Sequence, residues 1–174
     1  SYSSIWKVPT TVLRFFTVYG PWGRPDMAIF KFTKGIINKK KIDLYNKGKM
    51  YRDFTYIDDI VDGVYKLINK APNTKQFGKI KNDSLSPVAP FRILNIGNTH
   101  KVYLLDFINE LEKQLGKKAI RNYMAMQKGD VKMTVSDTTL LKKITGYNPK
   151  THYKIGIKKF LEWYLFYYKI DNKY

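Results

Sequence analysis

The sequence contains no cysteine, which excludes a disulfide framework and every metal site built on thiolates. It contains only two histidines, His100 and His152, and neither stands in the spacing of a metal-ligand pair. No apolar run is as long as a membrane-spanning helix, and no signal-peptide pattern is visible. From these absences we expect no metal, no membrane partner and a cytoplasmic location.

Acidic residues and arginine are also scarce, whereas lysine is abundant. The formal net charge is +18, which is typical of a nucleic-acid-binding surface. However, only five of the 32 basic residues are Arg, and the lysines are scattered over most expected elements, with a single run at 39–41. Ile, Asn and Tyr are plentiful too, as AT-rich codons would produce. We therefore expect no nucleic-acid partner, although the charge would attract an anionic small ligand.

Strand-like and helix-like segments alternate along the chain, whose 174 residues suffice for one domain with a sizeable core. Short apolar runs predict strands at 10–18, 42–46, 51–56, 91–96 and 119–123, and the first of these is expected to be buried. Apolar periodicity predicts helices at 27–38, 58–71, 104–115, 138–144 and 153–168, and residues 71–90 are predicted to form an exposed loop. The predicted fold class is α/β.

Charged residues stand at the start of two of these elements and inside a third. We expect Asp26 to cap the helix at 27–38. Asp58 and Asp59 resemble a catalytic carboxylate pair, but a first helical turn explains them, because negative charge is favourable at the positive end of the helix dipole. Arg14 interrupts the first strand, and we expect it to form a structural ion pair.

Two short motifs imitate functional sites. Gly20 and Gly23 follow a strand like the start of a dinucleotide-binding turn, but the third glycine position holds Asp26, whose carboxylate would repel a pyrophosphate. Tyr45 and Lys49 have the Tyr-x-x-x-Lys spacing of short-chain dehydrogenases, which requires a helix to bring both side chains to one face. Here the motif crosses an Asn-Lys-Gly turn, so neither motif predicts a cofactor site or a catalytic base.

Four longer blocks carry a resemblance to a known family. They are LRFFTVYGPWGRPDMA at 13–28, YNKGKMYRDFTYIDDI at 45–60, LNIGN at 94–98 and MQKGDV at 126–131. Together they resemble the C-terminal half of the UDP-glucuronate 4-epimerases, a branch of the extended short-chain dehydrogenase/reductase superfamily. The resemblance covers nearly the whole chain in order, which makes it far more specific than one short motif.

The resemblance implies a two-part enzyme that inverts C4 of UDP-glucuronate to give UDP-galacturonate through a 4-keto intermediate. In this family a Rossmann domain binds NAD and carries the catalytic Tyr-x-x-x-Lys, while the smaller part binds the UDP-sugar. Residues 1–174 would be the UDP-sugar-binding half, in which 1–25 are the last part of a truncated Rossmann domain. The main NAD site and the catalytic residues are expected before Ser1, so the chain is expected to be an inactive fragment of a homodimeric enzyme.

The resemblance also assigns three residues to the sugar and diphosphate. Thr17 would hydrogen-bond the glucuronate carboxylate, and Arg24 would donate to the carboxylate or the diphosphate. Arg52 would clamp the UDP diphosphate, and an Arg opening a strand beside a Gly turn has little structural need. Arginine is rare in this chain, and a need for a planar donor with two parallel N–H groups explains why arginine is used at positions 24 and 52.

The remaining assignments concern the nucleoside and the cofactor. Asp130 would accept the ribose hydroxyls, and Gln127 stands where sugar-epimerase relatives use Arg, so it is assigned to the nucleotide. Tyr45 and Asn46 would lend backbone groups to the uracil. Tyr19 either lines the cofactor pocket or simply packs in the core, and the residues leave both alternatives open.

Three other functions remain open at this point. One is a different NAD-dependent UDP-sugar epimerase, decarboxylase or dehydratase, against which Thr17 and the loop with Arg24 favour an acidic sugar. Another is a basic nucleotide- or nucleic-acid-binding module, and the third is a non-catalytic UDP-sugar-binding protein.

Overall fold

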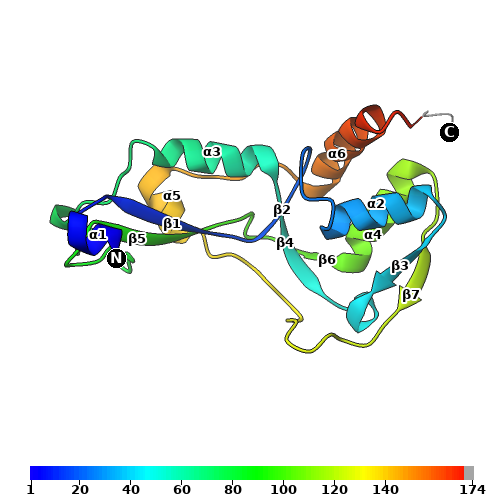
Figure 1. Cartoon of the computed structure of the whole chain (residues 1–174), viewed down its shortest axis with the longest axis horizontal. Helices are drawn as coiled ribbons and strands as arrows, with labels where there is room; N and C mark the ends of the chain where they lie inside the picture. Colours follow the sequence, from blue (N-terminus) through cyan, green and yellow to red (C-terminus); the bar gives the residue numbers. More distant parts are fainter. Residues whose placement is uncertain (171–174) are drawn as a thin grey trace.

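The computed structural model describes residues 1–170 and shows an elongated α/β molecule (Figure 1). The first half comprises α1 (Tyr2–Trp6), β1 (Thr10–Phe15), β2 (Thr17–Tyr19), α2 (Ala28–Ile37), β3 (Lys41–Leu44), η1 (Tyr45–Gly48), β4 (Tyr51–Tyr56) and α3 (Ile57–Leu67). The second half comprises η2 (Thr74–Gln76), β5 (Phe91–Ile96), β6 (Lys101–Tyr103), α4 (Leu104–Leu115), β7 (Ile120–Tyr123), α5 (Thr139–Thr145) and α6 (Tyr153–Tyr167). The predicted α/β class is confirmed.

Three small sheets organise these elements. β1 pairs with β5 and β3 with β7, both in parallel, while β4 lies between parallel β2 and antiparallel β6. In Figure 1, α1, α3 and α5 lie near the β1–β5 pair at one end, and α2, α4 and α6 gather at the other end. Strands β2 and β4 connect the two ends.

The first predicted strand, 10–18, is in fact two strands that belong to different sheets. The chain changes partners at Phe16, whose N–H still donates to Ile96 O of β5 at 3.3 Å, whereas Thr17 is already in register with Phe54 of β4. The expectation that this strand is buried is wrong for β1, none of whose residues is buried. Arg14 is exposed there and forms no ion pair within residues 1–170, contrary to expectation.

Several other elements follow their sequence patterns closely. β4, β5 and α4 have the predicted bounds, and α3 begins with Asp58 and Asp59 in its first turn as expected. Asp59 also accepts hydrogen bonds from two backbone N–H groups of residues 150–151. The predicted capping of α2 is wrong: Met27 is the N-cap and makes no side-chain cap hydrogen bond, because the carboxylate of Asp26 is paired with Arg24. The short β6 was not expected.

The main core lies between α2, α4, α6 and β4 and is rich in aromatic rings. Phe54 of β4 stacks on Phe107 of α4 with ring centroids 4.0 Å apart, and Tyr19 meets both rings edge-on. Helix α6 approaches this cluster through Gly156, where an added Cβ would lie 2.0 Å from Tyr19 Oη. The cluster therefore fixes the position of α6 relative to β2, the strand that contains Tyr19.

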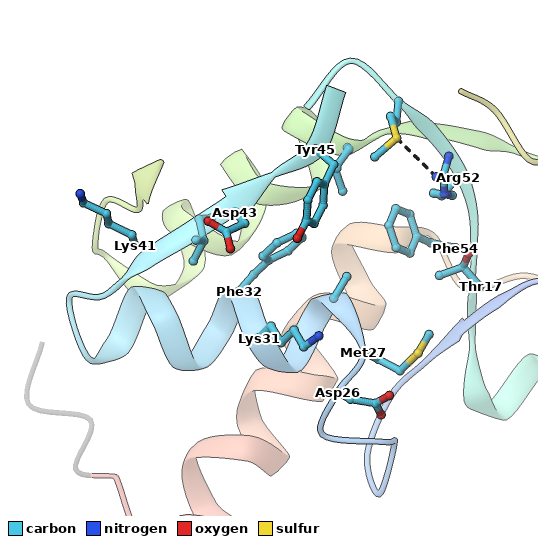
Figure 2. A pocket seen from close by; sticks show the side chains of 14 residues that line it. Thr17, Asp26, Met27, Lys31, Phe32, Lys41, Asp43, Tyr45, Arg52 and Phe54 are labelled. Atoms are coloured by element: carbon cyan, nitrogen blue, oxygen red, sulfur yellow. Dashed lines mark hydrogen bonds between the residues drawn. The ribbon is translucent and has the colours of Figure 1, made fainter. Parts of the chain in front are cut away.

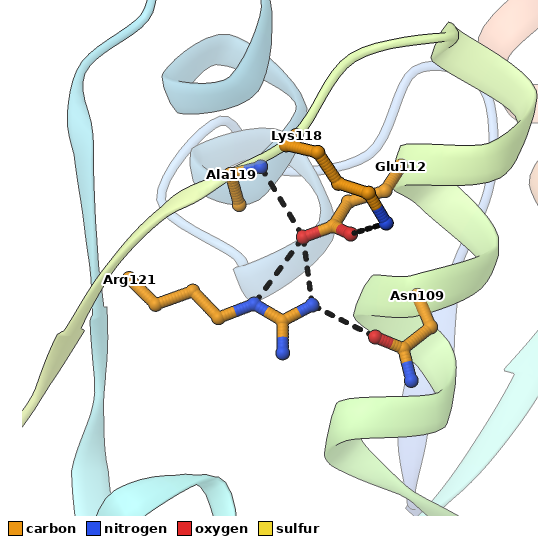
Figure 3. A network of polar contacts seen from close by, with 5 residues as sticks. All are labelled: Asn109, Glu112, Lys118, Ala119 and Arg121. Carbon is orange, nitrogen blue, oxygen red and sulfur yellow. Dashed lines mark hydrogen bonds and ion pairs between the residues drawn. The ribbon is translucent and has the colours of Figure 1, made fainter.

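A buried carboxylate ties α4 to β7 (Figure 3). Glu112 Oε1 accepts from Arg121 Nη2 at 2.7 Å and from the Ala119 N–H at 3.2 Å, and Glu112 Oε2 accepts from Lys118 Nζ at 2.9 Å. Burial by itself raises the pKa of Glu112, but the hydrogen bonds from Arg121 and Lys118 outweigh it and lower that pKa below its ordinary value. Because β7 pairs with β3, this network supports the strand along one side of the cavity described below.

Several apolar side chains near β1 and on α3 are exposed to solvent. β1 pairs only with β5 among the described residues, so its other edge is open, as expected for a strand that lacks sheet neighbours. The exposed apolar side chains in residues 2–15, and those on α3 and its C-cap, are Tyr2, Ile5, Trp6, Val8, Val12, Phe15, Val61, Val64, Tyr65 and Ile68. Across residues 1–170, no helix combines the length and apolar character needed to cross a membrane.

Candidate functional site

A cavity of about 550 Å³ opens between α2, the β3–η1 segment and the start of β4. This volume is within the range of ligand pockets in proteins, roughly 300–1,000 Å³. Figure 2 shows Phe32 and Phe54 on its apolar wall and the charged side chains of Lys31 and Arg52 at its margins. Three of the predicted site residues line it, namely Thr17, Tyr45 and Arg52.

Arg52 is held at the cavity by the strand and by an acidic partner. Its Nη1 donates to its neighbour's carbonyl, Tyr51 O, at 2.9 Å, and Nη2 lies 2.9 Å from Asp130 Oδ1 and 3.4 Å from Met50 Sδ. The Arg52 side chain is 17% exposed, so it is largely desolvated but still reachable. Because a guanidinium has five N–H donors, this arrangement leaves donors for a ligand anion.

Asp130 is brought to the site by a segment far along the chain. It is not a lining residue of the cavity, but its ion pair with Arg52 places it at the margin, with its side chain 30% exposed. Its second carboxylate oxygen makes no hydrogen bond among the described residues. A carboxylate in this position is suited to accept hydroxyl groups of a ligand whose anion lies on Arg52.

Thr17 reaches the cavity because it opens β2, next to β4. Its register partner is Phe54, so the threonine side chain and the aromatic ring lie on neighbouring strands of one sheet. Thr17 is half-buried, and Figure 2 shows it beside Phe54. Its hydroxyl makes no hydrogen bond within residues 1–170 and is available to a ligand.

Tyr45 and Asn46 belong to the tight turn η1, in which Asn46 and Lys47 have left-handed backbone angles. Tyr45 lines the cavity, whereas the Asn46 side chain is used by the turn itself and donates to Lys49 O at 2.8 Å. The Tyr45-x-x-x-Lys49 motif therefore does not lie on a regular helix. This confirms that it cannot present both side chains as a short-chain dehydrogenase does.

Arg24 and Gln127 lie outside the cavity lining. Arg24 forms a two-pronged pair with Asp26, with Nε–Oδ1 at 3.1 Å and Nη2–Oδ2 at 2.5 Å, and its side chain is 75% exposed. That pair lowers the pKa of Asp26, a residue that does line the cavity. Gln127 is exposed, and its carbonyl accepts from the Asp130 N–H at 3.3 Å. Their roles toward a ligand stay predictions.

Tyr19 is a core residue, which agrees with the packing alternative. Its hydroxyl donates to Tyr153 O at 3.3 Å, and the residue is only 4% exposed. Burial, together with the nearby Tyr56 and Asp59, raises the pKa of Tyr19, so its hydroxyl stays protonated at neutral pH. A role toward a cofactor is not needed to explain this residue.

The turn at Gly20 and Gly23 does not fit the pyrophosphate of NAD. A Cβ on Gly20 would lie 2.5 Å from Ile57 Cγ2, and one on Gly23 would lie 3.0 Å from Phe30 Cε2. Side chains thus pack closely against both glycines, which leaves little room for a Cβ at either position. In the part of the chain that is described, no three His, Cys, Asp or Glu side chains are grouped so that they could hold a metal ion.

The structure adds residues that the sequence did not single out. Lys31 of α2 lines the cavity, and its sequence context did not distinguish it from the other scattered lysines. Phe32 appeared only as a core position of a helix. Asp53, next to Arg52, is fully buried and accepts five hydrogen bonds. The only signal in the sequence was an acidic residue inside a short strand, next to Arg52.

Known proteins resemble this chain closely. The family model described as "NAD dependent epimerase/dehydratase family" matches residues 1–81. "Protein CapI" of Staphylococcus aureus is 49% identical over 97% of this chain and 51% of its own length. The "Probable UDP-glucuronate 4-epimerase" of Rhizobium meliloti is 46% identical over 94% of this chain and 49% of its own length.

A solved structure shares the fold. UDP-glucuronic acid 4-epimerase from Bacillus cereus, in complex with UDP-glucuronic acid and NAD, superposes with a TM-score of 0.76 at 30% identity. The match covers 93% of this chain and 47% of that chain. The chain thus spans about half the length of the curated relatives it matches.

The arrangement of parallel strands, helices and a cavity beside β4 defines an α/β protein with the fold of the extended short-chain dehydrogenases/reductases. The similarity extends over nearly all of the described chain and includes the blocks around Thr17 and Arg52. The chain is similar to the NAD dependent epimerase/dehydratase family over residues 1–81 and to UDP-glucuronate 4-epimerases over nearly its whole length.

Proposed function

We propose that this chain is the UDP-sugar-binding part of an NAD-dependent UDP-glucuronate 4-epimerase. The observation that carries the proposal is the meeting of Thr17, Tyr45 and Arg52 in one cavity, with Asp130 held against Arg52. These residues come from separate segments, and each bears a group suited to one portion of a UDP-sugar. The similarity to relatives named as UDP-glucuronate 4-epimerases supports the choice of substrate.

The roles follow from the chemistry of each group. Arg52 would donate charge-assisted hydrogen bonds to the diphosphate, which are about twice as strong as neutral ones. Asp130 would exchange part of its pairing with Arg52 for the ribose hydroxyls. Tyr45, at the η1 turn, would border the uracil, with Asn46 beside it. The free hydroxyl of Thr17 would donate to the sugar carboxylate, and Arg24 would join it after leaving Asp26.

The redox chemistry in this proposal lies outside the described residues. NAD, when bound to the whole enzyme, would supply the hydride exchange at C4. The contribution of this chain is to bind the UDP group and to fix the orientation of the sugar. Orientation of this kind lowers the entropic part of the barrier. The chain alone is therefore expected to bind UDP-sugars without turning them over.

Calorimetric titration of the chain with UDP, UDP-glucuronate and UDP-glucose tests the binding part. We expect all three to bind, with UDP-glucuronate the tightest. Joining the chain to a family Rossmann part that carries the Tyr-x-x-x-Lys motif, followed by assays of both sugars, tests the reaction. Turnover of UDP-glucose but not UDP-glucuronate would contradict the substrate. Binding of an RNA oligonucleotide near physiological salt, without any binding of UDP, would favour the basic nucleic-acid module instead.

A further inference from the structure

Asp53 is a buried carboxylate that forms no ion pair with any residue of the described range 1–170. Its charge is balanced by hydrogen bonds alone. Oδ1 accepts from Thr55 Oγ1 at 3.0 Å and from the Asn98 N–H at 2.8 Å. Oδ2 accepts from the Thr99 N–H at 3.1 Å, the Ser136 N–H at 2.9 Å and Ser136 Oγ at 2.5 Å. Burying a charge in this way is costly unless its lone pairs are satisfied, as they are here.

These donors join three segments that are distant in sequence. Thr55 belongs to β4, Asn98 and Thr99 follow β5, and Ser136 precedes α5. The junction is closely packed, because a Cβ on Gly97 would lie 2.5 Å from Ser136 Oγ and 3.0 Å from Asp53 Oδ2. No larger side chain fits at position 97 without moving the serine. Asp53 is therefore the common hydrogen-bond acceptor at a closely packed junction of three segments.

The segment that carries Asp130 ends at this junction, where Ser136 donates to Asp53. Between Asp130 and Ser136 this segment runs beside β4, with the Tyr51 N–H donating to Lys132 O at 2.9 Å and the Thr134 N–H donating to Tyr51 O at 3.2 Å. Asp130 meets Arg52 at one end, and Ser136 meets Asp53 at the other. Arg52 lines the cavity and Asp53 does not, as the alternation of side chains along a strand requires.

We propose that Asp53 is a positioning residue for the ligand site. By holding Ser136, it fixes segment 130–136 against β4 and so sets the geometry between Arg52 and Asp130. Asp53 itself touches no ligand. That the positioned site binds a UDP group rests on the function proposed above, whereas the placement of segment 130–136 is a property of the protein alone.

The simpler reading is that Asp53 only stabilises the fold, and Asp83 offers a matched control for it. Asp83 is also a buried aspartate, with a side chain 3% exposed, and it accepts from Arg92 Nε at 3.0 Å and Arg92 Nη2 at 2.9 Å. Arg92 is the second residue of β5, Asp83 lies in the loop before it, and neither of them lines the cavity. Asp83→Asn and Asp53→Asn make the same chemical change at two buried sites.

The experiment compares the full chain with Asp53→Asn, Ser136→Ala and Asp83→Asn. Amide hydrogen exchange is measured across residues 130–136, and affinity for UDP is measured by calorimetry. In Asp53→Asn an NH₂ group faces N–H donors, so we expect exchange at 130–136 to rise about tenfold or more and the Kd for UDP to rise about tenfold. Ser136→Ala should move both quantities in the same direction by less. Asp83→Asn should lower the melting temperature and leave both unchanged.

Two results would overturn the inference. One is exchange at 130–136 that rises no more in Asp53→Asn and Ser136→Ala than in Asp83→Asn. The other is unchanged UDP affinity in a variant whose segment has loosened. If Asp53→Asn fails to fold, Ser136→Ala decides by the same criteria. If the unmodified chain does not bind UDP, the proposed function fails, and the exchange data alone decide whether Asp53 positions the segment.

Discussion

Arg52 Nη2 lies 2.9 Å from Asp130 Oδ1, although the two residues stand 78 positions apart. The pair presents an anion-binding group and a hydroxyl acceptor side by side at the rim of one cavity. A nucleoside diphosphate carries those two functions, phosphate and ribose, in adjacent positions. Because both side chains remain partly exposed, a ligand can reach the pair.

Replacing Arg52 is expected to weaken UDP binding. Arg52→Ala removes charged hydrogen bonds worth about 1.5–3 kcal/mol, so the Kd should rise roughly 10- to 100-fold. Arg52→Lys keeps the charge but loses the planar fork, and it should recover only part of the loss. Calorimetry at one salt concentration provides the measurement. The control is Arg14→Ala, since Arg14 is exposed on β1, outside the cavity lining; an equal loss there would indicate a non-specific charge effect.

Replacing Thr17 is expected to change the choice between ligands. Thr17→Val keeps the β-branched shape but removes the hydroxyl proposed to meet the sugar carboxylate. The affinity for UDP-glucuronate should fall about three- to tenfold, whereas the affinity for UDP should be nearly unchanged. Competition of the two ligands in one titration measures the ratio directly. Thr11→Val, in β1, is the control, and a fall in both affinities by the same factor would contradict a role toward the sugar.

The hydrogen bonds and ion pairs of Glu112 are expected to make the free energy of unfolding depend on pH in the acidic range. Because hydrogen bonds from Arg121 and Lys118 lower the pKa of Glu112 in the folded state, its contribution is fully present above the ordinary value of 4.5. That contribution is lost as the pH falls through the lowered folded value. Glu112→Gln should therefore reduce the free energy of unfolding by about 1–3 kcal/mol at pH 7 and by much less near pH 3. Urea unfolding at both pH values measures the difference.

The control for that measurement is Glu162→Gln. Glu162 is exposed, and its carboxylate is 4.0 Å from Lys158 Nζ, so its pair is worth little. We expect its unfolding free energy to differ from that of the unmodified chain by less than about 0.5 kcal/mol at either pH. A pH-independent effect of Glu112→Gln would show that the changed hydrogen bonding of the neutral amide, and not the charge of the carboxylate, is responsible.

Gly156→Ala is expected to destabilise the protein even though alanine favours helices. In an exposed helix this change would stabilise by about 1 kcal/mol. Here the added Cβ would lie 2.0 Å from Tyr19 Oη and 2.7 Å from Tyr19 Cζ, so the ring or the helix must shift. We expect a net loss of about 1–3 kcal/mol, the usual cost of overpacking, measured by thermal unfolding. Ile155→Ala, an exposed change in the same helix, should be nearly neutral; stabilisation by Gly156→Ala would contradict the close approach.

Much of the local structure could be predicted from residue patterns. β4, β5 and α4 were predicted with the observed bounds, because their apolar periods and flanking glycines act over a few residues. The blocks around Thr17 and Arg52 also identified the family before any coordinates were known. The run at 10–18 was predicted as one strand, since nothing in its composition marks the change of partner at Phe16. The change of partner depends on which strand lies beside each part of the run, which is β5 for residues 10–15 and β4 for residues 17–19.

The candidate site shows the same division. Residue types and spacing by themselves determined the α/β class and the exclusion of thiolate chemistry, and the family resemblance added the choice of Arg52 as an anion donor. Only the tertiary structure decided that Arg52 meets Asp130, that Tyr19 packs in the core and that Asp53 joins three segments. The physical reason is the separation along the chain over which each effect acts. Propensity and periodicity act between neighbours in the chain, whereas a contact across 78 positions exists only when the whole core has packed.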